Sequence, residues 1–166
     1  MFNQAQQFNS STSTAFLPML LLYAVLLNSI KMREILFRGK AKDKWCVGSL
    51  LVDWAGTCQI WEKDNDNALH NFIVDEKTVG QYTGVVDSLG KRIFEHDVIK
   101  VYRKEEPERT YHTFIVFRDG VGDFVQKDCR YASRNTTYPI AYYGNRFEVV
   151  GNIIDNPEFI ENGRTA

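Results

Sequence analysis

Short apolar runs, each followed by a polar cluster, recur along residues 35–154. The runs are rich in Val, Ile, Phe, Tyr and Trp, and the clusters between them hold Gly, Asp, Asn and Lys. This pattern is typical of a mainly β protein, since β-branched and aromatic residues favour strands and the clusters favour turns. It predicts strands at residues 35–38, 45–53, 58–62, 70–74, 80–86, 97–102, 110–118, 123–126 and 146–154.

Turns are predicted at Ala55-Gly56, at residues 87–91 and at Asp119-Gly120. Asp-Gly indicates a two-residue hairpin connection, because type I′ turns need positive φ at both central positions. Little helix is expected, and only residues 128–139 are predicted to hold a short one. Such a chain is expected to close into a small barrel or a sandwich, since open sheet edges invite aggregation.

The N-terminal segment, residues 1–31, differs from the rest in composition. It has no acidic residue and one basic residue, Lys31. Its first half is rich in Gln, Asn, Ser and Thr and is predicted to be disordered, and its apolar run at residues 15–27 is shorter than the about 20 residues that span a bilayer. Membrane insertion is therefore not favoured. Two interpretations stay open: an accessory apolar helix, or an artefact of start-site assignment, with Met32 as the true start.

Composition narrows the classes of function. The 166 residues are 44% hydrophobic and 13% aromatic, which suits one globular domain with a small appendage. The formal net charge is −1, so the chain as a whole has no electrostatic attraction to DNA or to anionic membranes. Cys46, Cys58 and Cys129 form no Cys-x-x-Cys pair, which argues against a disulfide framework or a zinc site and favours reduced thiols in a cytoplasmic protein.

The stretch from Thr83 to Val101 superficially resembles a phosphate-binding loop. Gly84 is followed by five residues before Gly90-Lys91, whereas a Walker A loop has four and then needs Ser or Thr after the lysine. A strand pattern follows it, where phosphate binding would need a helix. We interpret the stretch as a structural turn, in which Asp87 accepts a hydrogen bond from the backbone two residues later and Gly90 adopts the left-handed conformation.

Four blocks of the sequence together resemble the YopX family of uncharacterised phage and prophage proteins. They are MREILFRGK, TVGQYTGVVDSLGKRIFEHDVIKV, FIVFRDG and FEVVGNIIDNPEFI, and the resemblance extends from Met32 to about Ile160. It implies a mainly β domain at residues 32–160 with an SH3-like barrel element, followed by a tail at residues 161–166. It also implies self-association and, since the family belongs to phages and prophages, places the cytoplasm expected from the cysteines in a bacterial host cell.

The chain departs from the family pattern in two places. Residues 1–31 have no counterpart, and the family's Gly-Asp pair is His96-Asp97 here. If that glycine serves a positive φ, His96 must adopt one too, which His tolerates better than a β-branched residue would. A general base or metal ligand at Glu95-His96-Asp97 is less favoured than a structural turn, because neighbouring strand residues point to opposite faces.

Other motifs give weak support for chemistry. The acidic cluster at residues 64–67 lacks the glycine and the final glutamate of a calcium loop, so we expect a solvated loop. Cys46 has no nucleophile signature around it that would pair it with a histidine. We predict no catalytic residue, no metal site and no cofactor.

Aromatic residues among arginines are the least ordinary feature of the C-terminal half. The candidate binding surface comprises Arg130, Tyr131, Arg134, Tyr138, Tyr142 and Tyr143. Core packing or a subunit interface explains such residues, and so does a platform for single-stranded nucleic acid. We therefore predict a non-enzymatic binding or assembly module, a homo-oligomer that can also bind another protein. The alternative is a nucleic-acid-binding accessory protein.

Overall fold

The structure is a computed structural model that describes residues 33–104, 106, 108–131, 136–140 and 146–161. The chain divides into two units, residues 1–33 and 34–166, and the second holds all the strands and helices given below. The predictions for residues 1–31, and for the tail apart from Glu161, lie outside the described residues.

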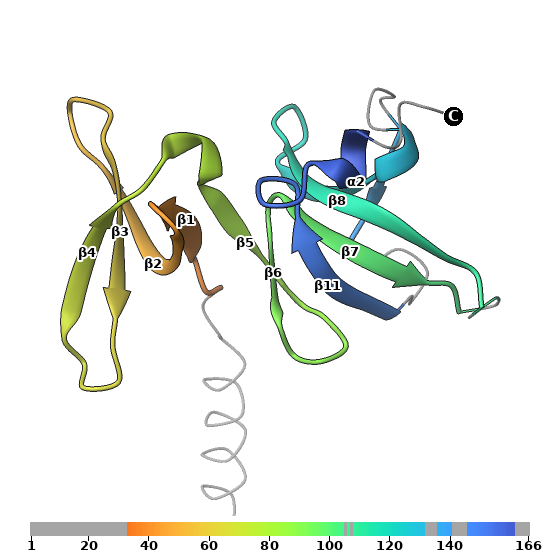
Figure 1. The fold of residues 1–166 in the computed structure, drawn as a ribbon, viewed down its shortest axis with the longest axis horizontal. Coiled ribbons are helices and arrows are strands. Elements are labelled where there is room, and N and C mark those ends of the chain that lie inside the picture. The colour runs from red at the N-terminus through yellow and green to blue at the C-terminus, as the bar shows by residue number, and fades with distance from the viewer. Residues whose placement is uncertain (1–32, 105, 107, 132–135, 141–145, 162–166) are drawn as a thin grey trace, which may run out of the picture. The chain divides into compact units, whose positions relative to one another are not determined.

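The first sheet is antiparallel, with strand order β4-β3-β2-β1-β5-β6 (Figure 1). Its strands in chain order are β1 (Phe37–Ala41), β2 (Lys44–Val52), β3 (Cys58–Lys63), β4 (Leu69–Ile73), β5 (Gly80–Val86) and β6 (Arg92–Phe94). A core beneath the β1–β4 part contains Cys46, Cys58, Ile60 and Val74.

The second sheet is also antiparallel, with order β10-β9-β8-β7-β11. Its strands are β7 (Asp97–Tyr102), β8 (Thr110–Arg118), β9 (Asp123–Asp128), β10 (Thr137–Pro139) and β11 (Arg146–Asn152). One face packs around Ile93, Ile99, Val101, Ile115, Ile140 and Phe147. The other buries Val98, Phe114 and Cys129 against Ile153, Phe159 and Ile160.

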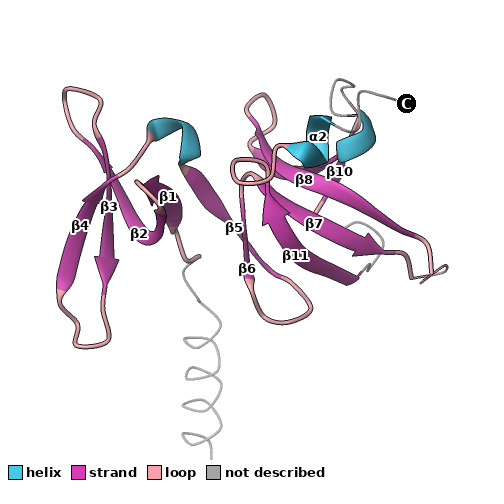
Figure 2. Cartoon of the chain, viewed as in Figure 1, coloured by secondary structure: helices cyan, strands magenta, loops and turns pink. Residues whose placement is uncertain are grey.

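Within the described part of the chain, helices are few and short, as Figure 2 shows. They are the 3-10 helices η1 (Glu76–Thr78) and η2 (Cys129–Tyr131) and the α-helix α2 (Glu158–Glu161). The mainly β prediction is therefore confirmed. The helix expected within residues 128–139 is reduced, among the described residues, to η2.

Of the predicted barrel or sandwich, the barrel is not observed among the described strands, and the prediction of a two-residue turn at Asp119-Gly120 is wrong. The described strands form two sheets with free edges, and no barrel closes among them. The connection after β8 has four residues rather than two, and its positive φ lies at Gly122 instead of Asp119 and Gly120. The amides of Val121 and Gly122 both donate to the Arg118 carbonyl, which closes this wider turn.

Gly48 is the point where β2 changes partners. Residues 44–48 pair with β1, and residues 49–52 pair with β3. A Cβ atom at Gly48 would lie 1.9 Å from the backbone oxygen of Trp61. Only glycine therefore allows the two halves of the first sheet to approach this closely.

Candidate functional site

The turn at residues 87–91 is organised by the Asp87 carboxylate. Its Oδ1 accepts hydrogen bonds from the amides of Leu89 and Lys91, both at 2.8 Å, and its Oδ2 accepts one from Val149 in β11 at 3.0 Å. Burial acts to raise the pKa of Asp87, but these amide donors lower it overall. Gly90 has φ +80°. The amides that a bound phosphate would need are occupied by Asp87, so this turn connects strands.

The start of the same stretch contains an irregularity in strand pairing. Thr83 Oγ1 donates to the Ile93 carbonyl at 2.8 Å and accepts from the Val85 amide at 3.2 Å. Gly84 has φ +85°, and the register between β5 and β6 shifts here. The side chain of Thr83 thus fills hydrogen-bonding positions that a regular ladder would supply.

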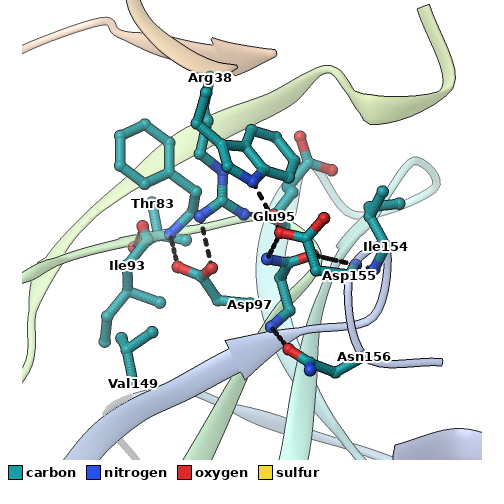
Figure 3. A network of polar contacts seen from close by, with 12 residues as sticks. Arg38, Thr83, Ile93, Glu95, Asp97, Val149, Ile154, Asp155 and Asn156 are labelled. Atoms are coloured by element: carbon teal, nitrogen blue, oxygen red, sulfur yellow. Dashed lines mark hydrogen bonds and ion pairs between the residues drawn. The ribbon is translucent and has the colours of Figure 1, made fainter. Parts of the chain in front are cut away.

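A buried ion pair joins β1 to the start of β7. Arg38 Nη1 donates to Asp97 Oδ1 at 2.6 Å, and the Phe94 amide donates to Oδ2 at 2.8 Å (Figure 3). Arg38 also donates to the Glu95 carbonyl at 3.0 Å and lies over the Trp45 ring at 4.6 Å. The Asp97 side chain is 1% exposed. Burial raises the pKa of Asp97, although the nearby guanidinium acts in the opposite direction.

His96 has φ +69°, in the left-handed region. Its amide donates to the Ile115 carbonyl, and its own carbonyl accepts from the Ile153 amide. Burial lowers the pKa of the imidazole, and Nδ1 is buried without a hydrogen-bond partner among the described residues. The backbone of His96 therefore links three segments, while its side chain makes no polar contact through Nδ1.

A second polar cluster surrounds Asp155, in the loop after β11 (Figure 3). Its carboxylate accepts hydrogen bonds from Asn152 Nδ2 at 2.9 Å, Lys40 Nζ at 2.7 Å and Trp45 Nε1 at 2.7 Å. These donors lower the pKa of Asp155 to about 2. Together with the Arg38–Asp97 ion pair, this cluster connects β1 and β2 by polar contacts to the start of β7 and to the loop after β11.

Replacing His96 with glycine is expected to leave the free energy of unfolding unchanged or to raise it by up to about 1 kcal/mol. The change removes the strain of a side chain at positive φ and the unpartnered Nδ1, and it loses only a half-buried ring. Urea denaturation measures the effect. Asn67→Gly, at φ +66° on an exposed loop, is the matched control. A clear loss of stability in His96→Gly alone would show that the imidazole is needed.

The predicted Tyr/Arg surface is described only in part. Arg130 and Tyr131 lie in η2 and Tyr138 lies in β10, whereas Arg134, Tyr142 and Tyr143 lie outside the described residues. Arg130 donates to both carboxylate oxygens of Asp128, at 3.1 and 2.7 Å. Its charge is therefore already paired within its own turn.

One face of the first sheet exposes several large apolar side chains and is a candidate surface for contact with another protein. We call the hairpin face the side of β2, β3 and β4 that presents Leu51, Trp61, Leu69 and Ile73. Their exposed fractions are 47%, 38%, 63% and 68%. The strand registers place Leu51, Gln59 and Ile73 in one row, with Trp61 two residues from Gln59 along β3, so these side chains share a face.

Trp54 adds a fully exposed ring at the turn between β2 and β3, with an exposed fraction of 99%. Asp53 Oδ1 accepts hydrogen bonds from the amides of Ala55 and Thr57, and Gly56 has φ +85°. The turn is thus fixed by local hydrogen bonds, while the large apolar ring that it carries faces solvent. A sequence signal for this surface exists: the consecutive apolar residues 50–52 must place apolar side chains on both faces of β2.

Comparison with known proteins gives the family. No curated protein matches the chain. A family model described as YopX protein matches residues 36–161. The chain belongs to the YopX family. The resemblance identified from the four sequence blocks is thereby confirmed.

Solved structures that resemble the chain include those of two bacterial proteins. The crystal structure of YopX from Bacillus subtilis aligns with a TM-score of 0.50 and 19% identity, over 77% of this chain and 98% of that one. The structure of EF1440 from Enterococcus faecalis aligns with a TM-score of 0.47 and 21% identity, over 76% of this chain and 98% of that one. At this identity the likeness to B. subtilis YopX shows the fold alone. The YopX match includes both polar clusters and the hairpin face.

Proposed function

We propose that this YopX-family protein is a non-enzymatic binding or assembly module that acts through the hairpin face. The observation that supports this most directly is the cluster of Leu51, Trp61, Leu69 and Ile73 on one exposed side of β2–β4. Exposed apolar patches of this kind mark sites of protein contact, and tryptophan is enriched among the residues that dominate binding energy. The expected occupant is another copy of the chain or a second protein.

The roles of the hydrogen-bonded carboxylates and of the buried Cys129 thiol support a non-enzymatic function. Asp97 is paired with Arg38, and Asp87 and Asp155 each accept several hydrogen bonds from their surroundings. Burial raises the pKa of the Cys129 thiol to about 12, so the nucleophilic thiolate is disfavoured. We therefore assign these groups a role in stabilising the fold.

The state of the cysteines supports a cytoplasmic location. The three cysteines are free and buried, which suits a reducing environment, and we place the protein in the cytoplasm of a phage or prophage host. Among the described residues, no helix has both the length and the hydropathy needed to cross a membrane.

A nucleic-acid-binding function is the second candidate, and one observation favours it. On the neighbouring strands β7 and β11 of the second sheet, the Arg146 guanidinium lies 4.3 Å and the Lys100 ammonium 5.2 Å from the Tyr102 ring. Aromatic rings beside cations form the usual platform for single strands. Glu148 accepts a hydrogen bond from the Tyr102 hydroxyl at 2.8 Å, however, and brings a negative charge to the same place.

Light scattering of the purified full chain, at about 50 and about 200 mM salt, tests the proposal. We expect a discrete oligomer without nucleic acid, as judged from the 260/280 nm absorbance ratio. Trp61→Ser should weaken this assembly, whereas Val121→Ser, an exposed apolar residue beyond β8, should not. A monomer that carries nucleic acid at low salt and releases it at high salt would favour the second candidate instead. Association unaffected by Trp61→Ser would contradict the role of the hairpin face.

A further inference from the structure

The two sheets have four edge strands, and three of them carry features that discourage pairing with another chain. β6 and β10 have only three residues each, and they contain Arg92 and Pro139. β11 contains Arg146 and Glu148 and has a register shift near its end. Short strands, charges, proline and bulges are the devices by which proteins protect sheet edges.

The fourth edge strand, β4, has none of these features. Its five residues are Leu-His-Asn-Phe-Ile, without Lys, Arg, Asp, Glu or Pro, and its register with β3 is regular throughout. Figure 1 shows β4 beyond β3 at the outer side of the sheet. An edge of this length with a regular register and no Lys, Arg, Asp, Glu or Pro is a template for another strand.

The pairing with β3 determines which backbone groups of β4 point outward. The Val74 amide donates to the Cys58 carbonyl, and the Asp64 amide donates to the Ala68 carbonyl, both at 3.0 Å. Since hydrogen-bonded positions alternate along an antiparallel strand, even-numbered residues of β4 bond to β3. The N–H and C=O groups of Leu69, Asn71 and Ile73 therefore point away from the sheet.

We propose that a second copy of this chain pairs with this edge, antiparallel, about a twofold axis at Asn71. This inference rests on the proposed assembly function and specifies its partner and register. Asn71 then lies opposite Asn71 of the partner subunit, and Leu69 lies opposite Ile73 of the partner subunit. All three outward-pointing residues exchange main-chain hydrogen bonds in this register.

The strand is self-complementary in this arrangement. Its outward-bonding residues run apolar, polar, apolar, so the twofold axis places Leu69 beside Ile73 of the partner subunit on each side of the axis, as a favourable cross-strand pair. No like charges meet, because β4 carries no acidic or basic residue apart from His70, which pairs with Asp64. Leu69 and Ile73 belong to the hairpin face, so the hairpin faces of the two subunits become continuous. A twofold axis generates such an interface from a single surface patch, because both subunits contribute the same patch.

The expected association is moderate in strength. Two five-residue strands bury less than the about 1,200 Å² of total area at the lower limit of standard interfaces. We therefore expect a dissociation constant on the order of 10 µM. Sedimentation velocity of the full chain, from well below to well above that concentration, should show a reversible monomer–dimer equilibrium.

Asn71→Pro tests the edge itself. Proline removes the outward-pointing amide and the exposed side-chain hydrogen bond from Asn71 Nδ2 to Gln59 Oε1, but it leaves the main-chain ladder with β3 intact, which edge strands tolerate. We expect at least a tenfold weaker dimer with a nearly unchanged melting temperature. Ile73→Lys provides a second disruption if the proline variant does not fold. Val121→Lys, at an exposed apolar residue beyond β8 that belongs to neither the β4 edge nor the hairpin face, is the matched control and should leave the dimer unchanged.

Thiol cross-linking tests the register. Asn71→Cys places two thiols directly across the axis, where Cα atoms of a hydrogen-bonded pair lie about 5.5 Å apart. A short bis-maleimide should therefore cross-link this variant. Leu51→Cys is the control, since Leu51 lies two strands in from the edge and, in this register, is too far from Leu51 of the partner subunit for a short cross-linker to span. Wild-type protein measures the background from the buried native cysteines.

The outcomes separate the two proposals. A dimer that Asn71→Pro weakens and that cross-links at residue 71 supports edge pairing. A dimer insensitive to Asn71→Pro but weakened by Trp61→Ser overturns edge pairing and leaves the proposed function standing. Association that neither substitution affects, or a monomer at every concentration that binds no protein, overturns both.

Discussion

Asp97→Ala is expected to lower the free energy of unfolding by about 3–5 kcal/mol, because it leaves a buried guanidinium without its counter-charge. The Arg38 side chain is only 12% exposed, and its Nε already has no hydrogen-bond partner among the described residues. Without Asp97, Nη1 loses its 2.6 Å contact, and the Phe94 amide loses its acceptor. Both losses occur in surroundings that water cannot easily reach.

Chemical denaturation of Asp97→Ala and of Asp123→Ala, measured in parallel, shows how much the burial of the ion pair contributes to the loss of stability. Asp123 also pairs with an arginine, Arg118, at 2.9 Å, but both side chains are more than 40% exposed. That exposed pair should contribute no more than about 1 kcal/mol. The double variant Arg38→Met/Asp97→Ala should be less destabilised than the sum of its single variants, since no unpaired charge remains. Equal losses for Asp97→Ala and Asp123→Ala would show that water reaches Arg38.

The alternation of apolar and polar residues predicts most strands well. β5, β7 and β8 have the predicted bounds, because each is a run of β-branched and aromatic residues that ends in a turn cluster. β6 and β10 were not predicted, since three residues are too few to show an alternating pattern. The sequence also does not predict that the barrel stays open, because strand pairing depends on bends such as the one at Gly48, where β2 changes partner from β1 to β3.

The polar clusters show a different limit of sequence reasoning. Asp97 was assigned to a structural turn, and its partner Arg38 lies 59 residues away in the chain. A buried carboxylate needs a partner, but the pattern around it does not say which of the arginines provides one. The positive φ of His96, in contrast, was anticipated from the family's glycine, because backbone conformation is a local property. The backbone conformation at His96 is therefore predictable from the sequence, whereas the turn at Asp119-Gly120 and the contacts between distant segments are not.

Gly48→Ala is expected to destabilise the protein by about 4 kcal/mol or more, or to prevent folding. The added Cβ would lie 1.9 Å from the Trp61 carbonyl oxygen and 2.7 Å from its carbon, and both are backbone atoms of the paired strand. A side chain could rotate away from such a contact, but a ladder strand must shift as a whole. Gly120→Ala is the matched control, since a Cβ there meets no atom within 4 Å and its φ is not positive.

Circular dichroism melting and urea denaturation measure the difference between these two variants. If Gly48 is the bend that lets β2 pair with β1 on one half and β3 on the other, then Gly48→Ala should also expose Cys46, which is fully buried two residues away. Faster labelling of the Cys46 thiol would show that the substitution disrupts the structure at the Gly48 bend. Equal stability of Gly48→Ala and Gly120→Ala would mean that β2 and β3 can separate at little cost, and the rigid hairpin face would then lose its structural basis.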